Sequence, residues 1–245
     1  MEIKKFKLND GTYFRYKKIG KGKPILLLHT FRNRLEYSDK LGELLKSKNT
    51  VYSIDLPGFG DSPINSKTIY DLNFFANSII EFIKNLKINN LRIAGESIGA
   101  VLSASVSVRL PKQVKKIFMF NPYDYDSYFG EGIRRGNFFA SFILFNISLP
   151  IIGNIFSSLE NKFILKNVMG GGFINPGNLS DEYLDLLCTS LKKKDTFIIF
   201  EMFCKNLKKI MKLKKLTKKS KYLSNLCTEL MIGQMNLKDC KPKSC

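Results

Sequence analysis

Between residues 24 and 120 the sequence alternates between two patterns of apolar residues, and this alternation limits the fold more than any other feature. Short unbroken apolar segments are typical of strands that are buried on both faces of a sheet. Apolar residues at three- and four-residue spacing are typical of helices that bury one face. The predicted strands are residues 24–29, 50–55, 91–95 and 114–120, and the predicted helices are residues 35–46, 72–86 and 97–110. Because a helix separates most strands from the next, we predict an α/β fold with a mostly parallel sheet flanked by helices.

The segments on either side of this region follow different patterns. Residues 2–18 alternate in polarity around a turn that contains Asp10-Gly11, which predicts a β-hairpin. After Phe120 the segments are apolar and helix-like, and one helix is predicted to begin at Ser180. We therefore expect a helical insertion over the edge of the sheet. The predicted division is a core at residues 1–126, a helical cap insertion at 127–204 and a basic, aberrant or truncated C-terminal segment at 205–245.

The composition limits the kinds of partner. A chain of 245 residues with 44% apolar and 25% charged residues is long enough and apolar enough to bury the core of one domain. The net charge of +19 is carried by 33 Lys and only 7 Arg, with 12 of the Lys in residues 205–245. Because bidentate hydrogen bonding to phosphate and guanine favours Arg over Lys, we expect no nucleic-acid partner.

One uncharged segment bears on membrane contact. Residues 137–159 are long enough to cross a bilayer, but Pro150 would break a helix near the middle, so we predict two short helices instead. Peripheral docking of this segment and of basic residues 205–221 on an anionic membrane is a less favoured alternative. The N-terminus lacks an apolar signal segment, and the five Cys include no CxxC pair. We therefore expect a cytoplasmic protein without a metal site or a cofactor.

The segment "LRIAGESIGA", residues 91–100, carries the clearest chemical signal. A serine between two glycines, where a strand runs into a helix, is typical of a strained turn that lifts the hydroxyl clear of the sheet. Gly95 and Gly99 lack the side chains that would clash in such a turn, and the N–H of Ile98 at the start of the helix can stabilise an oxyanion. We predict that Ser97 is a nucleophile, with an ordinary glycine-rich turn as the alternative.

Three segments together resemble the α/β-hydrolase family of the type with a helical cap. They are "LLLHTFRNR" at residues 26–34, "DLPGFGDSP" at 55–63 and "GESIGA" at 95–100, and the resemblance covers residues 24–122. In the first segment Thr30 stands where the family usually has glycine. The resemblance implies an oxyanion hole made of the N–H groups of Phe31 and Ile98, provided that Thr30 keeps a negative φ. It also implies that His29, the only histidine, is a structural residue of this loop.

The resemblance implies that an acid and then a histidine follow the serine along the chain. Asp239 is one candidate acid, because residues 229–239 superficially resemble the strand and loop that carry it. Asp124 and Asp126, just after Phe120, are the alternatives, and each of the three also fits an ordinary solvated loop carboxylate. No residue matches the histidine, and we expect the last strand and helix of the family fold to be lacking.

Three explanations for the missing histidine stay open. The chain is a natural non-catalytic relative, or it is truncated, or its end is out of frame. The out-of-frame explanation has one clue in the sequence. When residues 230–236 are written in AT-rich codons and read from one base earlier, the codons encode Tyr-Asp-Trp-Ser-Asn-Glu. The resemblance makes this relevant, because one branch of the family has Asp-Trp-Ser at its catalytic acid.

The expected function is hydrolysis of a small apolar ester or related acyl compound, a small-molecule substrate, impaired because the histidine is absent. Phe138, Phe142 and Phe145 are the expected substrate-binding residues, within an apolar stripe that also fits plain packing of the cap. The rest of that stripe is Phe139, Ile143, Ile147 and Phe156. The alternative function is a non-catalytic binding protein of the same fold.

Overall fold

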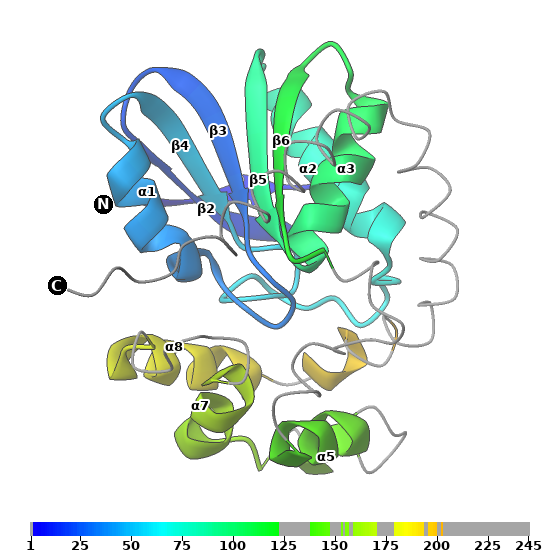
Figure 1. Cartoon of the computed structure of the whole chain (residues 1–245). Helices are drawn as coiled ribbons and strands as arrows, with labels where there is room; N and C mark the ends of the chain where they lie inside the picture. The colour runs from blue at the N-terminus through cyan, green and yellow to red at the C-terminus, as the bar shows by residue number, and fades with distance from the viewer. Residues whose placement is uncertain are drawn as a thin grey trace, which may run out of the picture.

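A six-stranded sheet with the order β1-β2-β4-β3-β5-β6 forms the centre of the computed structural model (Figure 1). The structure describes residues 2–122, 138–147, 153, 155–156, 159–170, 179–193, 196–199 and 202. Four strands run parallel, namely β3 (Lys23–Leu28), β4 (Asn49–Ile54), β5 (Leu91–Glu96) and β6 (Val114–Phe120). The predicted α/β class and mostly parallel sheet are confirmed.

The predicted hairpin is also confirmed and extends the sheet on one side. β1 (Ile3–Lys7) and β2 (Tyr13–Ile19) pair antiparallel, and β2 also pairs antiparallel with β4. Gly11 lies in the turn with φ of 86°, a conformation that glycine adopts without steric strain. The hairpin places Arg15 and Lys17 of β2 beside the segment that follows β3.

Helices cover both faces of the sheet, as the alternating pattern predicts. α2 (Leu72–Asn85) and α3 (Ile98–Arg109) pack on one face, and α1 (Asp39–Leu45) lies on the other (Figure 1). The helix predicted at residues 35–46 begins instead as a short 3₁₀ helix, η1 (Leu35–Ser38), a geometry that is common at helix N-termini.

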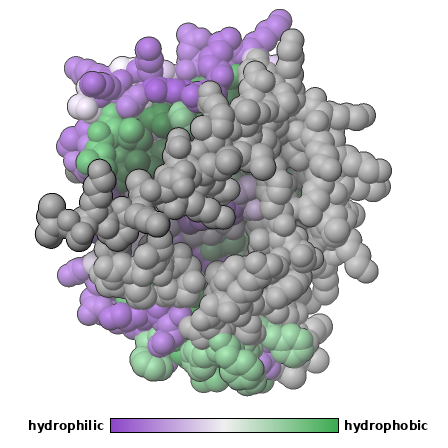
Figure 2. Space-filling model, viewed as in Figure 1, coloured by the Kyte–Doolittle hydropathy of each residue, from purple (hydrophilic) through white to green (hydrophobic). Residues whose placement is uncertain are grey.

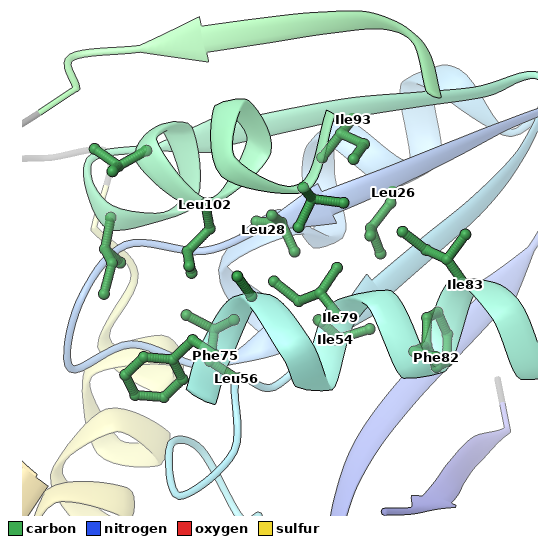
Figure 3. Close-up of a cluster of buried hydrophobic side chains, with 14 of the residues drawn as sticks. Leu26, Leu28, Ile54, Leu56, Phe75, Ile79, Phe82, Ile83, Ile93 and Leu102 are labelled. Carbon is green, nitrogen blue, oxygen red and sulfur yellow. The ribbon is translucent and has the colours of Figure 1, made fainter. Parts of the chain in front are cut away.

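The main core lies between the sheet and α2. Figure 3 shows Ile79 and Ile83 of α2 directed at Leu26 and Leu28 of β3. Their spacing of four residues along the chain belongs to the apolar pattern that predicted the helix. This packing fixes the carboxyl end of β3, and with it the loop that begins at His29.

Three helices follow Phe120 in the described part of the chain, and the second and third of them share a small core of their own. They are α5 (Phe138–Ile147), α7 (Lys162–Gly170) and α8 (Asp181–Leu191), and they lie beside the loops that follow β3 and β4 (Figure 1). α8 begins after the predicted Ser180, whose hydroxyl accepts a hydrogen bond from Tyr183 N at 3.3 Å. We call these three helices the cap. Within the described part of the chain, the cap contains no strand, and no helix is long and apolar enough to cross a membrane.

Candidate active site

The turn between β5 and α3 has the strained geometry that its glycine spacing predicts. Ser97 adopts φ of 54° and ψ of −112°, and its N–H donates to Phe120 O at 2.9 Å. A Cβ on Gly95 would lie 2.2 Å from the carbonyl oxygen of Gly99, and a Cβ on Gly99 would lie 2.5 Å from Leu28 O. Both glycines are therefore required by close backbone contacts.

Two polar groups at this turn have no partner in the described part of the structure. The Ser97 hydroxyl forms no hydrogen bond to a described residue, and the side chain is half-buried. The N–H of Ile98 begins α3 and likewise has no acceptor among these residues. A free N–H at a helix N-terminus carries a partial positive charge, so an anion is stabilised next to Ser97.

His29 is a structural residue of the loop after β3, as the resemblance implies. It is buried, its Nε2 accepts from Leu56 N at 2.9 Å, and its Nδ1 lies 2.7 Å from Thr30 O. Because Thr30 O is an acceptor, Nδ1 carries the proton and donates. Burial lowers the pKa of His29, which keeps the ring neutral. With both nitrogens occupied, the ring is committed to this loop.

Thr30 keeps the negative φ that an oxyanion hole at this loop requires. Within residues 2–122 the non-glycine residues with positive φ include Arg32 at 58° but not Thr30. The sharp change of direction in this loop therefore falls two residues after the position where the family usually has glycine. Phe31, between them, packs edge-on against Phe59 with ring centroids 5.0 Å apart.

The three residues after Phe31 all contact residues that follow Phe120: Arg32 pairs with Glu160, just before α7, whereas Asn33 and Arg34 contact α8. Arg32 forms an ion pair with Glu160, whose side chain is 4% exposed. Tyr183 of α8 donates its hydroxyl to Asn33 Oδ1. Arg34 Nη1 donates to Leu186 O at 2.7 Å. No sequence motif indicates these contacts, because residues 32–34 are 128 to 152 positions away from their partners in the sequence.

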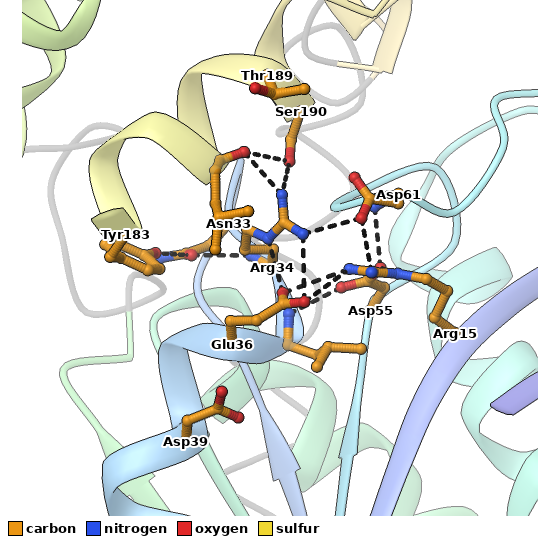
Figure 4. Close-up of polar contacts among 12 residues, drawn as sticks. Arg15, Asn33, Arg34, Glu36, Asp39, Asp55, Asp61, Tyr183, Thr189 and Ser190 are labelled. Carbon is orange, nitrogen blue, oxygen red and sulfur yellow. Dashed lines mark hydrogen bonds and ion pairs between the residues drawn. The ribbon is translucent and has the colours of Figure 1, made fainter. Parts of the chain in front are cut away.

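Arg34 also belongs to a buried network of charges between the core and the cap (Figure 4). Its Nε donates to Glu36 at 2.6 Å and its Nη2 to Asp61 at 2.9 Å. Arg15 of β2 donates through Nε to the fully buried Asp55 at 2.7 Å and pairs with Asp61 at 2.6 Å. Burial alone would raise the pKa of Glu36, but the hydrogen bond and charge of Arg34 hold it below the ordinary value.

Lys193, just after α8, adds a buried contact between cap and core. Its Nζ donates to Gly58 O at 3.1 Å and to Ser62 O at 2.7 Å, both in the loop after β4. Burial lowers the pKa of Lys193 to about 8.

Glu96, the residue before Ser97, is bound by Tyr37, whose ring lies beside that of Tyr183. Tyr37 of η1 donates its hydroxyl to Glu96 Oε2 at 2.5 Å, and the rings of Tyr37 and Tyr183 are 6.1 Å apart. Burial, followed by the charge of Glu96, raises the pKa of Tyr37 far above its ordinary value. The phenol therefore remains a donor at any neutral pH.

The predicted substrate-binding phenylalanines of α5 are largely exposed. Phe138 is 88% exposed, whereas Phe142 and Phe145 are half-exposed, and Figure 2 shows an apolar surface at this side of the cap. The α5 side chain that packs with Phe31 is Ile143, which is 6% exposed. The exposure arises because a helix that is apolar on all sides cannot bury every side chain against one neighbour, and substrate binding by Phe138, Phe142 and Phe145 stays a prediction.

The candidate acids are not brought to the site by the described structure. Asp124, Asp126 and Asp239 lie outside the described residues. Within the described part of the chain, no cluster of His, Cys, Asp or Glu has the arrangement of a metal site.

Comparison with known proteins identifies the fold family. The family model described as alpha/beta hydrolase fold matches residues 23–166, which include all four parallel strands, the loop after β3 and the turn at Ser97. The chain belongs to the alpha/beta hydrolase fold family.

Individual members of this family share limited identity with the chain. An (E)-2-((N-methylformamido)methylene)succinate hydrolase of Acinetobacter baylyi is 29% identical over 121 residues, 49% of this chain and 46% of that protein. A pimeloyl-(acyl-carrier protein) methyl ester esterase of Pseudoalteromonas atlantica is 24% identical over 162 residues, 65% of this chain and 58% of that protein. The chain thus spans about half the length of these relatives.

Solved structures of the family share the fold. Cfl2 of Burkholderia cenocepacia superposes with a TM-score of 0.74 at 17% identity, covering 87% of this chain and 75% of that one. The epoxide hydrolase CorEH gives a TM-score of 0.71 at 18% identity, covering 88% and 78%. At such identities the likeness concerns the fold.

Proposed function

We propose that this alpha/beta hydrolase uses Ser97 as the nucleophile in hydrolysis of a small, mainly apolar ester or related acyl compound. The observation that carries the proposal is the position of Ser97 at φ of 54° between β5 and α3, with a hydroxyl that no described residue binds. A strained turn of this kind at the end of a central strand is typical of an exposed nucleophile.

The chemistry that fits this geometry is acyl transfer to water. Ser97 Oγ attacks the carbonyl carbon, and the negative charge on the carbonyl oxygen is stabilised by the N–H groups of Ile98 and Phe31. The ester C–O bond then breaks, and the alcohol leaves with the proton of the serine. Water attacks the acyl-serine, releases the acid and restores the hydroxyl. Each oxyanion donor lowers the barrier by roughly 3 kcal/mol in comparable enzymes.

The general base that this reaction needs is not supplied by His29. His29 is the only histidine in the 245 residues, and both of its nitrogens are hydrogen-bonded away from Ser97. We therefore propose impaired turnover, at the residual level of about 10³–10⁴ over water that remains when a triad member is removed. Asp239 and Asp124 stay as proposed acids.

The proposed substrate class follows from the apolar residues near the loop after β3. Phe31 and Phe156 both pack against Ile143 of α5. Two of the relatives are named for hydrolysis, one of them an ester hydrolase, which supports acyl chemistry in this chain as well.

The second candidate function is ligand binding without turnover by the same fold. The hydrogen bonds on both ring nitrogens of His29 favour this binding function, because a non-catalytic protein needs no general base. Reaction with a fluorophosphonate, which modifies only activated serines, distinguishes the two candidates.

The test measures covalent labelling of the whole chain by mass spectrometry. We expect a single adduct on Ser97 that is lost in Ser97→Ala. Ser103→Ala is the matched control, because Ser103 lies on α3 with its hydroxyl donating to Gly99 O at 2.7 Å, and it should be labelled like the wild type. Absence of any adduct on the folded wild type would exclude the activated nucleophile and leave the binding protein.

A further inference from the structure

Glu96 is a carboxylate without a counter-charge. Its Oε2 accepts from the Tyr37 hydroxyl, and in the part of the chain that the structure describes it forms no ion pair. The side chain is half-buried at the carboxyl end of β5, directly before Ser97. A half-buried carboxylate is stabilised when a cation lies beside it, and this one has only a neutral hydroxyl.

Three buried or half-buried carboxylates elsewhere between the core and the cap are paired with arginines. Glu36 binds Arg34, Asp55 binds Arg15, and Glu160 binds Arg32. Since the arginines between the core and the cap are engaged by these acids, Glu96 differs from these three carboxylates. A cation at Glu96 must therefore come from outside this network.

Two neighbouring aromatic rings lie next to each other near Glu96, because Tyr37 binds Glu96 and Tyr183 lies beside Tyr37. The rings of Tyr37 and Tyr183 are 6.1 Å apart at an angle of 47°, and both side chains are half-buried. The Tyr37 hydroxyl is directed to Glu96 and the Tyr183 hydroxyl to Asn33, so both rings are held in place. The faces of tyrosine rings attract cations, most strongly where water is partly excluded.

We propose that Glu96, Tyr37 and Tyr183 form a subsite for an ammonium group, so that the substrate of this chain carries a protonated or quaternary amine in addition to its apolar part. The carboxylate supplies charge and the rings supply cation–π contact. The inference rests on the proposed function only in placing the acyl group of that substrate at Ser97. The binding of the ammonium group itself is independent of the reaction.

The test compares two small molecules of the same shape that differ in charge. Choline carries a trimethylammonium group, and 3,3-dimethylbutan-1-ol carries the neutral tert-butyl group in its place. Binding of each to the whole chain is measured by NMR titration, without any covalent step. We expect choline to bind at least about tenfold more tightly than its neutral analogue.

Variants assign this preference to Glu96. Glu96→Gln keeps an acceptor for Tyr37 and removes only the charge, so the preference should fall to within about twofold, while the neutral analogue binds as before. Glu43→Gln is the matched control, because it removes the same charge from an exposed position on α1 and should keep the preference. Tyr183→Leu removes one ring and should weaken choline several-fold more than the neutral analogue.

Equal binding of the two molecules to the wild type, or a preference that survives both Glu96→Gln and Tyr183→Leu, overturns the subsite. Labelling of Ser97 by the fluorophosphonate reports separately on the proposed reaction. If choline is preferred over its neutral analogue, this preference depends on Glu96, and Ser97 is not labelled, the subsite is supported and the proposed hydrolysis is excluded. Labelling without a charge preference does the reverse.

Discussion

Arg34 and Ser190 are 156 residues apart in the sequence, and Arg34 Nη1 donates to Ser190 Oγ at 2.6 Å. The same guanidinium binds Glu36 and Asp61 from the core, and its side chain is 2% exposed. One side chain thus joins the loop after β3, the loop after β4 and helix α8. The position of the cap over the core depends on it.

Arg34→Ala should lower the free energy of unfolding by about 1.5–3 kcal/mol, because it removes charge-assisted hydrogen bonds to Glu36 and Asp61, while Arg15 still pairs with both carboxylates. Urea denaturation of the whole chain measures the change. Lys46→Ala removes an ion pair with Glu43 that is about half-exposed on both sides, and should change the stability by less than about 1 kcal/mol. Equal effects of the two substitutions would show that the Arg34 network does not hold the cap.

Gly99→Ala should lower the free energy of unfolding by about 3 kcal/mol or more, because the new methyl group would overlap the backbone of Leu28. Labelling of Ser97 should be lost in parallel. Gly11→Ala is the control, since nothing lies within 4 Å of its Cβ position and only the unfavourable φ costs about 1–2 kcal/mol. A Gly99→Ala protein as stable as Gly11→Ala contradicts the close packing at the turn.

His29 should make the protein less stable in acid. Burial lowers its pKa below the ordinary 6.5, so below pH 6.5 the unfolded chain binds a proton that the folded chain does not. The contribution is fully present above pH 6.5 and is lost as the pH falls, by up to about 1.4 kcal/mol per pH unit. We expect the stability difference between wild type and His29→Gln to shrink from neutral pH to pH 5.5, because the carboxylates common to both proteins cancel. A difference that is independent of pH would contradict a buried neutral ring.

Lys193 should show the same sign of pH dependence as His29, in an alkaline range. Its pKa of about 8 lies below the ordinary 10.5, so between these values the unfolded chain holds a proton that the folded chain has released. The wild type should therefore gain stability relative to Lys193→Met as the pH rises from 8 towards 10.5. The comparison with the variant separates this gain from the ionisation of tyrosines in the same range. A stability difference that does not change over this range means that Lys193 is charged and well solvated in the folded chain, and a relative loss means that folding stabilises its charge.

The sheet could be predicted from the sequence because its signals are local. A strand buried on both faces must be apolar throughout, as residues 25–28 are, and a helix on the sheet must repeat its apolar residues at three or four positions, as α2 does. The turn at Ser97 was predictable for the same reason, since its two glycines stand close to the serine in the chain. The structure confirms both features.

The surroundings of the site could not be predicted in this way. The partners of Arg34 and Glu96 come from α8 and η1, and no short pattern in the sequence indicates that these segments meet. The buried face of α5 could not be predicted either, because a segment that is apolar at nearly every position has no apolar periodicity that would indicate which face is buried. Exposure of Phe138 and burial of Ile143 follow from tertiary packing alone.

The placement of the cap contacts on residues 32–34 has a consequence for protein engineering. The loop that holds the cap is continuous with the peptide bond of Phe31, so a chimera that replaces residues 138–193 alone would leave three unmatched side chains beside that bond. A cap from another member of the family should therefore be transplanted together with its own version of residues 29–34.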